Sequence, residues 1–414
     1  MLSRARRGWA RFAVLFGRWT GRLSRRAGLG AGSIIGGRVT LWLDRGALTG
    51  LAAGRRVVLV SGTNGKTTTS HLLAAALRTT GGPVAHNASG SNMADGAVAA
   101  LTQVPDARYA VLEIDEWHLG AVARAVDPAV IILLNLTRDQ LDRGTEVRAV
   151  AAALGAALAE HPQTLVVANA DDPMVVWAAS MASRVCWVAA GAGWVGDTAT
   201  CPRCGNILCA DGPAWTCPCG LSQPQPDWSL TGQMLATGES STRLALRLPG
   251  RCNISNAALA VAAAAALGVP PERAAAAMGE LDEVAGRFAV IQRGEQELRL
   301  LLAKNPAGWV ETLPVLEQAR SLLIVINARE ADGRDTSWLW DVPFEGLPPR
   351  PMVASGERAA DLGVRLSYAG LDHSTEPDPV AALSLLPAGK VDVVANYTGF
   401  RQLLHRLAKE APTR

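Results

Sequence analysis

Short apolar runs recur along the first part of the chain, and each ends in glycine or in polar residues. The runs at 57–60, 109–112, 129–134 and 165–168 have the length of buried strands, and helical segments follow them. A longer apolar run at 258–269 is typical of a buried helix. Strands that alternate with helices and carry polar groups at their ends predict an α/β fold with a doubly wound parallel sheet.

The N-terminal segment combines apolar and basic positions at helical spacing. Its apolar positions include Phe12, Leu15, Phe16, Trp19 and Leu23. Eight arginines are interleaved with them, and the first acidic residue is Asp44. This predicts a basic amphipathic helix that either docks on its own protein or rests on an anionic membrane surface.

The amino-acid composition is that of a globular protein and gives no sign of a membrane-spanning or secreted one. Of the 414 residues, 49% are hydrophobic and 19% are charged, as in ordinary globular proteins. No apolar run approaches the roughly 20 residues of a membrane span, and no secretory signal is recognisable. We therefore expect a cytoplasmic protein, peripheral to the inner face of the membrane if the N-terminal helix binds lipid. The net charge of +3 indicates no nucleic acid partner.

Residues 55–82 predict a phosphate-binding loop between a strand and a helix, RRVVLVSGTNGKTTTSHLLAAALRTTGG. The helix N-terminus and a lysine supply positive charge, and a threonine stands where such loops place a hydroxyl for Mg²⁺. Val60 stands where the first glycine of the common longer loop would fall. The residues expected to bind a nucleoside triphosphate are Gly62, Thr63, Asn64, Gly65, Lys66, Thr67 and Thr68. A glycine turn without a ligand is the alternative.

Carboxylates follow the next apolar run, in YAVLEIDEWHLG at 109–120. A carboxylate at the C-terminal end of a parallel strand beside a phosphate loop is well placed to hold Mg²⁺. Thr67 and Glu113 are therefore the predicted magnesium ligands. A solvated acidic strand end is the alternative.

Five of the seven cysteines lie within CPRCGNILCADGPAWTCPCG, residues 201–220. Cys201 and Cys204 form a CxxC pair, Cys217 and Cys219 form a CxC pair, and a glycine follows each pair. This pattern is typical of a zinc ribbon, in which four thiolates fill the tetrahedron and leave a structural site. Cys209 is a less favoured substitute ligand, and redox-active thiols are the alternative.

Several motifs, taken in order, resemble those of the Mur ligases. They are GTNGKTTTS, the acidic strand end at Glu113, NLTRDQLDR, NADDP, GRCNISNAALA and GRF. LAKNPAGW, NAREADGRDTSWLWD, ANYTG and the cysteine insertion are similar to one branch, the MurT family of ligase-like subunits of lipid II isoglutaminyl synthase. The resemblance spans about residues 40–400.

We expect three parts: the basic helical segment at 1–43 and, as the resemblance implies, a central ATPase domain at 44–290 and a C-terminal α/β domain at 291–414. The zinc ribbon would be inserted in the central domain at about 198–222. The implied cofactors are ATP, Mg²⁺ and Zn²⁺. Asn253 matches a nucleotide-binding position of the family, and Arg287 matches an arginine near the phosphates, although both could be structural.

The implied reaction is amidation of the α-carboxyl of D-glutamate in the lipid II stem peptide, through an acyl phosphate that ammonia attacks. Whether lipid II or an earlier precursor is the acceptor stays open. Gln140 stands where Mur ligases usually carry histidine. No lysine lies between 67 and 303 to be carbamylated, as many Mur ligases require. One alternative is a stand-alone Mur-like or folylpolyglutamate-synthetase-like amino-acid ligase, and another is a nucleotide-binding scaffold whose ATPase is vestigial and whose zinc ribbon serves assembly.

The histidines and cysteines form no recognisable glutaminase motif. The resemblance implies a separate GatD-type glutaminase subunit, to whose Cys-His pair this chain lends an aspartate. Asp332 precedes glycine in a turn that we expect to be exposed, and it is the favoured residue. Asp335, at the start of DTSW, is expected to cap a helix.

Overall fold

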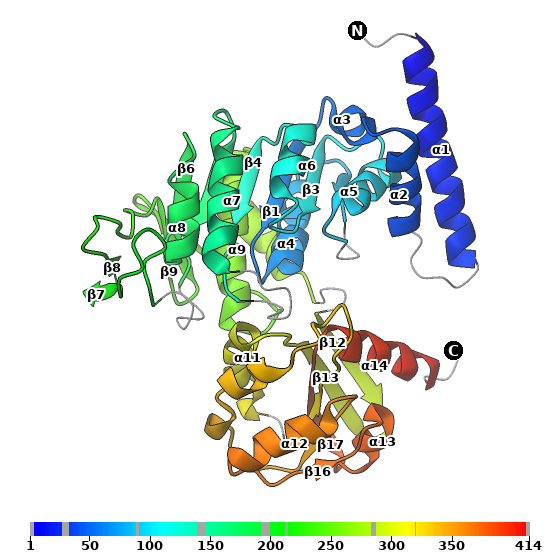
Figure 1. Cartoon of the computed structure of the whole chain (residues 1–414), viewed down its shortest axis with the longest axis vertical. Helices are drawn as coiled ribbons and strands as arrows, with labels where there is room; N and C mark the ends of the chain where they lie inside the picture. Colours follow the sequence, from blue (N-terminus) through cyan, green and yellow to red (C-terminus); the bar gives the residue numbers. More distant parts are fainter. Residues whose placement is uncertain are drawn as a thin grey trace. The chain divides into compact units, whose positions relative to one another are not determined.

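The computed structural model of the chain describes residues 4–26, 33–87, 91–138, 146–191, 199–211, 214–282, 287–318 and 320–410. The chain divides into two compact units, which Figure 1 displays. The first consists of Met1–Thr137, Glu146–Leu248 and Cys252–Leu281. The second consists of Arg138–Thr145, Pro249–Arg251 and Asp282–Arg414. Each unit is built on its own sheet.

The sheet of the first unit has nine strands in the order β11-β10-β9-β6-β5-β4-β1-β3-β2. The seven strands from β9 to β2 run parallel, and β10 and β11 extend the sheet in antiparallel fashion. The strands are β1 (Arg56–Ser61), β2 (Val84–His86), β3 (Tyr109–Glu113), β4 (Val130–Leu133), β5 (Leu165–Asn169), β6 (Val185–Ala189), β9 (Trp228–Thr231), β10 (Met234–Thr237) and β11 (Ser240–Arg243).

Helices cover both faces of this sheet, so the predicted doubly wound arrangement is confirmed. Val57 and Leu59 of β1 pack in one hydrophobic core with α3, α5, α6, α7 and α8. Val58 and Val60 alternate with them and are also fully buried, on the face where α4 contacts β1, β2 and β3. The helices are α3 (Ala47–Ala52), α4 (Lys66–Arg78), α5 (Ala94–Gln103), α6 (Leu119–Val126), α7 (Val147–Ala159), α8 (Pro173–Ala179), α9 (Arg251–Ala266) and α10 (Pro271–Gly279).

The second unit has a six-stranded sheet in the order β12-β13-β17-β14-β15-β16. β12 and β13 form an antiparallel pair, and the other pairings are parallel. Two hydrophobic cores lie in this unit, one containing Trp309 and Phe344 and the other Phe400. The elements are β12 (Phe288–Arg293), β13 (Gln296–Leu302), α11 (Pro306–Thr312), β14 (Ser321–Val325), β15 (Met352–Ser355), α12 (Ala359–Tyr368), β16 (Ser374–Thr375), α13 (Pro379–Ser384), β17 (Gly389–Ala395) and α14 (Tyr397–Glu410), with 3-10 turns at Leu313–Gln318, Ser337–Asp341 and Phe344–Gly346.

Two further helices and a hairpin complete the first unit. The predicted N-terminal helix is α1 (Arg4–Arg26), which packs on α2 (Ser33–Leu43), and α2 packs on α5. The hairpin of β7 (Cys209–Asp211) and β8 (Ala214–Thr216) lies in the cysteine-rich insertion. None of the described helices has the length and apolarity that crossing a bilayer requires.

A buried carboxylate ties two neighbouring strand–helix units together. Asp172 caps α8, and its Oδ1 accepts hydrogen bonds from the N–H groups of Met174 (2.9 Å) and Val175 (3.1 Å). Its Oδ2 accepts the N–H of Leu136 (2.8 Å), just beyond the end of β4. One side chain therefore satisfies three buried donors from two segments.

We expect Asp172→Ala to lower the free energy of unfolding of the first unit by about 3 kcal/mol, because three donors lose their acceptor. Asp378→Ala is the matched control. Asp378 caps α13 through Val380 and Ala381, but its side chain is 46% exposed. Water can replace it, and we expect a loss of about 1 kcal/mol. Urea denaturation of each variant measures the difference, and equal losses would contradict this account of the cap.

Candidate nucleotide and metal sites

The predicted phosphate loop lies between the end of β1 at Ser61 and the start of α4 at Lys66. Gly62 and Gly65 have φ angles of +132° and +85°, which side chains rarely adopt. A Cβ on Gly62 would lie 3.0 Å from the carbonyl oxygen of Asn135, and one on Gly65 would lie 2.9 Å from Nδ2 of Asn256. Glycine is therefore required at both turns, by conformation and by space.

Asn135, just beyond β4, holds the loop in place. Its carbonyl oxygen accepts the N–H of Thr63 (2.8 Å), and its Oδ1 accepts the N–H of Asn64 (2.9 Å). Its Nδ2 donates to the carbonyl of Asn64 (3.0 Å). Thr63 is also linked to Thr137, whose N–H donates to Thr63 Oγ1 (3.0 Å). The backbone of the loop is thereby fixed before any ligand binds.

Lys66 places a buried positive charge at the loop. Its side chain is 8% exposed, and Nζ donates to the carbonyl oxygens of Gly62 and Thr63. Nζ also lies 3.2 Å from Oε1 of Glu116, whose side chain is 12% exposed. These partners offset the cost of burying the ammonium group. Phosphate oxygens could take the place of the Glu116 carboxylate at this cation.

The structure brings Thr67 and Glu113 together. Thr67 Oγ1 donates to Glu113 Oε2 (2.8 Å), and both residues are buried. Asn87 fixes the end of β3 through two reciprocal bonds of 2.8 Å with the backbone of Glu113. A hydroxyl and a carboxylate oxygen side by side are hard ligands that could hold a divalent cation together with phosphate and water.

The other predicted nucleotide contacts belong to three different segments of the chain. Thr68 is buried in the first turn of α4. Asn253 is half-buried in the first turn of α9 in the first unit, whereas Arg287 precedes β12 in the second unit. Gln140 lies outside the described residues. The roles of Asn253 and Arg287 therefore stay predictions.

Three asparagines at the site received no role from the sequence: Asn87, Asn135 and Asn256. Asn256 stands three residues after Asn253 on α9, so both lie on neighbouring positions of one helix face. That spacing is the signal that could have identified it. Asn87 and Asn135 follow β2 and β4, and a polar residue just beyond a parallel strand is the corresponding signal for them.

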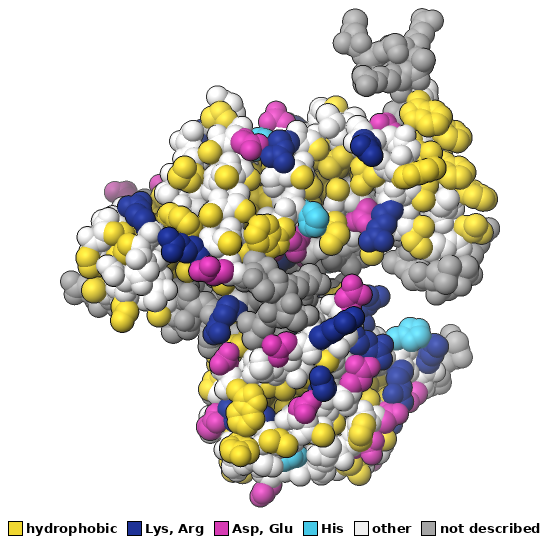
Figure 2. All heavy atoms as spheres, viewed as in Figure 1, with side chains coloured by type: hydrophobic (Ala, Val, Ile, Leu, Met, Phe, Trp, Pro, Cys, Tyr) yellow, Lys and Arg dark blue, Asp and Glu magenta, His cyan; other side chains and the backbone are white. Residues whose placement is uncertain are grey.

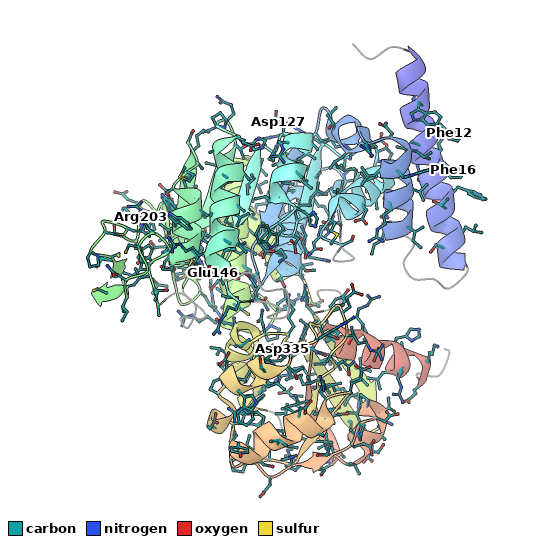
Figure 3. The ribbon with its side chains drawn as sticks, in the orientation of Figure 1. Phe12, Phe16, Asp127, Glu146, Arg203 and Asp335 are labelled. Carbon is teal, nitrogen blue, oxygen red and sulfur yellow. The ribbon has the colours of Figure 1, made fainter. Side chains whose placement is uncertain are left out.

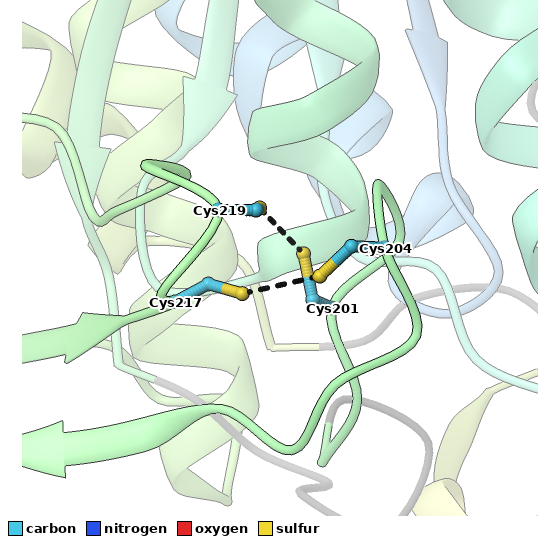
Figure 4. A group of neighbouring side chains, drawn as sticks. All are labelled: Cys201, Cys204, Cys217 and Cys219. Carbon is cyan, nitrogen blue, oxygen red and sulfur yellow. Dashed lines mark hydrogen bonds between the residues drawn. The ribbon is translucent and has the colours of Figure 1, made fainter.

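Four of the cysteines converge on one point, which Figure 4 shows. The Sγ atoms of Cys201, Cys204, Cys217 and Cys219 lie within 4.8 Å of one another. Cys201 and Cys219 are 3.6 Å apart, and Cys204 and Cys217 are 3.4 Å apart. Cys209 is exposed on β7 and does not belong to this group. The four thiols could hold one metal ion.

Backbone turns position these thiols. Gly205 and Gly220 have φ angles of +79° and +87°, and their N–H groups donate to the carbonyls of Cys201 and Cys217 (2.9 Å each). A backbone hydrogen bond from Leu221 lowers the pKa of the Cys219 thiol to about 7. This shift favours the thiolate, the form that binds metal.

The expected exposure of Asp332 is wrong. Asp332 is buried, and its carboxylate accepts hydrogen bonds from both the N–H (2.8 Å) and the hydroxyl of Thr398. Burial raises the pKa of this carboxyl group, although the bonds from Thr398 oppose the shift. The turn of residues 329–332 is held against the first turn of α14 by those two bonds.

Asp335, labelled in Figure 3, is half-buried and therefore more accessible than Asp332. Its Oδ1 accepts the N–H of Ser337 (2.8 Å), and this bond lowers the pKa of its carboxyl group. The N-cap of the 3-10 turn Ser337–Asp341 is Thr336, so Asp335 stands one residue before the expected capping position.

Family descriptions match two parts of the chain: Mur ligase middle domain at residues 60–192, and MurT ligase C-terminal at residues 302–400. The chain is 31% identical to lipid II isoglutaminyl synthase (glutamine-hydrolyzing) subunit MurT of Streptococcus pneumoniae, over 83% of each chain. It is 28% identical to the Staphylococcus aureus subunit of the same name, over 85% of this chain and 87% of that relative.

Solved structures share the fold at lower identity. A pseudomurein peptide ligase type C from Methanothermus fervidus has a TM-score of 0.69 and 18% identity, covering 88% of this chain and 80% of that one. MurF from Acinetobacter baumannii has a TM-score of 0.68 and 19% identity, covering 90% and 80%. The α/β architecture described above is thus that of the Mur ligases.

Proposed function

The chain belongs to the MurT family of Mur ligase-like proteins, and on this premise we propose that it is the synthetase subunit of a lipid II isoglutaminyl synthase. ATP phosphorylates the α-carboxyl of D-glutamate in the lipid II stem peptide. Ammonia then displaces phosphate from the acyl phosphate and forms D-isoglutamine. Phosphorylation is needed because a carboxylate has no good leaving group. The observation that carries this proposal is the phosphate loop with a buried Lys66, in a chain similar to the MurT subunits along most of its length.

We assign the phosphates of ATP to the loop from Gly62 to Thr68, with Lys66 as the fixed positive charge. Thr67 and Glu113 would hold Mg²⁺, which would offset negative charge on the transferred phosphoryl group. Asn253 and Arg287 are proposed nucleotide contacts because they match family positions. In this assignment Glu116 balances the lysine while the site is free of nucleotide.

We further propose that the four-cysteine group binds zinc and that the ion is structural. Zinc–sulfur bonds of about 2.3 Å place tetrahedral sulfurs about 3.8 Å apart, close to the separations observed. Cys201, Cys217 and Leu221 form a small core with Val176 of α8, on which the insertion packs. The ion would thereby stabilise one end of the ATPase sheet.

The ammonia is proposed to come from a separate GatD-type glutaminase. The names of the MurT relatives describe them as subunits of a glutamine-hydrolyzing enzyme. Within this chain, burial raises the pKa of the Cys186 thiol to about 11, which makes it a poor nucleophile at neutral pH. Four further cysteines belong to the proposed zinc site, where metal binding would occupy their sulfur atoms.

An aspartate of this chain is proposed to complete the Cys-His pair of that partner. Such a residue must offer a carboxylate oxygen to another protein. Asp332, which the sequence favoured, uses its carboxylate on Thr398 inside the unit. Asp335 is half-buried, and its hydrogen bonding is to the neighbouring Ser337. Asp335 is therefore the better candidate, and Asp332 is assigned to holding the loop.

We expect Thr67→Val to weaken binding of an ATP analogue in the presence of Mg²⁺ by at least about tenfold, because the hydroxyl is lost while the shape is kept. Thr69→Val is the matched control, since Thr69 is fully buried two residues away and its hydroxyl has no partner among the described residues. We expect the control to bind the nucleotide normally. Isothermal titration calorimetry compares them, and equal losses would contradict the magnesium assignment.

We expect the purified protein to contain about one zinc ion per chain, and Cys201→Ser/Cys204→Ser to lose it. Loss of the site should also lower the melting temperature, because a structural ion contributes to folding. Cys209→Ser should keep both the metal and the melting temperature. Elemental analysis and thermal denaturation measure these effects. A native protein without zinc, or a double variant that retains it, would overturn the proposal.

We expect the complex with its glutaminase to form ADP and amidated lipid II from either glutamine or ammonium chloride. Asp335→Asn should reduce the glutamine-dependent rate at least about 100-fold and leave the ammonium-dependent rate within about twofold, since only ammonia production is affected. Mass spectrometry of lipid II measures amidation, and a coupled assay measures ADP.

Asp332→Asn and Lys66→Met discriminate the alternatives. We expect Asp332→Asn to lower thermal stability and both rates together, and Lys66→Met to abolish both. Selective loss of glutamine use in Asp332→Asn would return the role to Asp332. ADP formation that requires an amino acid instead of ammonia would indicate a stand-alone ligase and would refute the proposed function.

A further inference from the structure

The N-terminal helix α1 exposes its large apolar side chains. Trp9, Phe12, Leu15, Phe16, Trp19 and Leu23 are each between 39% and 63% exposed. The aromatic rings form a ladder along the helix, with centroid distances of 5.5 Å, 5.8 Å and 5.9 Å between successive members. Figure 2 shows hydrophobic atoms gathered along α1, and Figure 3 shows Phe12 and Phe16 projecting from it.

The opposite face of α1 is made of small residues and is buried. Ala13, Gly17 and Gly21 lie on this face. A Cβ on Gly17 would lie 2.6 Å from the carbonyl oxygen of Gly36 on α2, and one on Gly36 would lie 2.7 Å from that of Gly17. The two backbones are therefore in direct contact. The helix cannot rotate its aromatic side chains inward without losing this seam.

The neighbouring helix α2 adds to the exposed apolar surface. Ile34, Ile35 and Trp42 are exposed, and Trp42 reaches 81%. We call the side chains of Trp9, Phe12, Leu15, Phe16, Trp19, Leu23, Ile34, Ile35 and Trp42 the apolar face. A helix docked only on its own protein would bury such residues and expose its glycines. Here the arrangement is reversed, so the apolar face is available to something outside this chain.

Positive charge flanks the apolar face. Arg11, Arg18 and Arg22 are exposed along one side of α1, and no acidic residue occurs before Asp44. This combination is complementary to a bilayer surface with anionic headgroups. A second copy of the chain would instead bring arginines of both copies together, without acidic partners on these helices to balance them.

We propose that α1 and α2 dock the protein on an anionic lipid bilayer, with the apolar face in the boundary between headgroups and acyl chains and the arginines against lipid phosphates. The proposal rests on these two helices and is independent of the proposed function. A protein that failed to amidate lipid II would still bind vesicles.

The test is sedimentation of the full chain with vesicles. We expect binding to vesicles of equal parts phosphatidylglycerol and phosphatidylcholine, and at least tenfold weaker binding to phosphatidylcholine alone. Phe12→Ser/Phe16→Ser/Trp19→Ser should lower the partition coefficient on the order of 100-fold. Arg11→Gln/Arg18→Gln/Arg22→Gln should lower it at least about tenfold and remove most of its dependence on salt.

Met181→Ser/Val364→Ser/Leu385→Ser is the control, because these three exposed apolar residues lie elsewhere and are 52% to 57% exposed. It should bind like the native chain, and circular dichroism should show all variants folded. Native protein that does not bind anionic vesicles, or an aromatic variant that binds normally, would overturn the proposal. So would a native dimer that the aromatic substitutions convert to monomer without any effect on vesicle binding.

Discussion

The arrangement of the candidate nucleotide site depends on one buried ammonium group, that of Lys66. Removing this charge from water is costly unless carbonyl and carboxylate oxygens surround it. The left-handed turns at Gly62 and Gly65 let the loop curl around the lysine, so that the carbonyl of Gly62 accepts from Nζ. Asn135 fixes that loop, and β3 carries Glu116 to the same place. The order of the strands therefore brings together the oxygen atoms that offset the cost of removing this charge from water.

Much of the first sheet follows from the sequence because its strands are buried on both faces. Runs such as Val57–Val60 are apolar without interruption, and only a central parallel strand accommodates that pattern. The strands β9 to β11 at one end of this sheet gave no such signal, since they are short and mostly half-buried or exposed. The helix α2 falls within the predicted helical segment 1–43, although no local signal set its bounds. Its Gly36 and Gly37 argue against a helix locally, and only packing against neighbouring backbones explains them.

The residues expected to contact ligands were easier to predict from the sequence than the residues that hold the phosphate loop in place. Residue type and sequence spacing indicate the ligands expected at Lys66, Thr67 and Glu113. Asn135 lies 71 residues from Asn64, so its role depends on contacts that no local pattern encodes. For Asp332, the local pattern gave a wrong prediction because a distant residue determines its burial. An Asp-Gly pair indicates an exposed turn, but Thr398, 66 residues away, closes over the carboxylate.

At the contact between α1 and α2, different groups serve helix packing and the outward-facing surface, two requirements that usually compete for the same side chains. Contact between the helices is made mainly by glycine backbone at Gly17 and Gly36, and of the outward side chains Trp9 also contributes, because its indole N–H donates to the carbonyl oxygen of Leu43 (2.9 Å). Substitutions at the other outward positions can therefore accumulate without loosening this contact. Over evolutionary time, the affinity of this surface for its target can drift or adapt freely while the geometry that presents it stays constant.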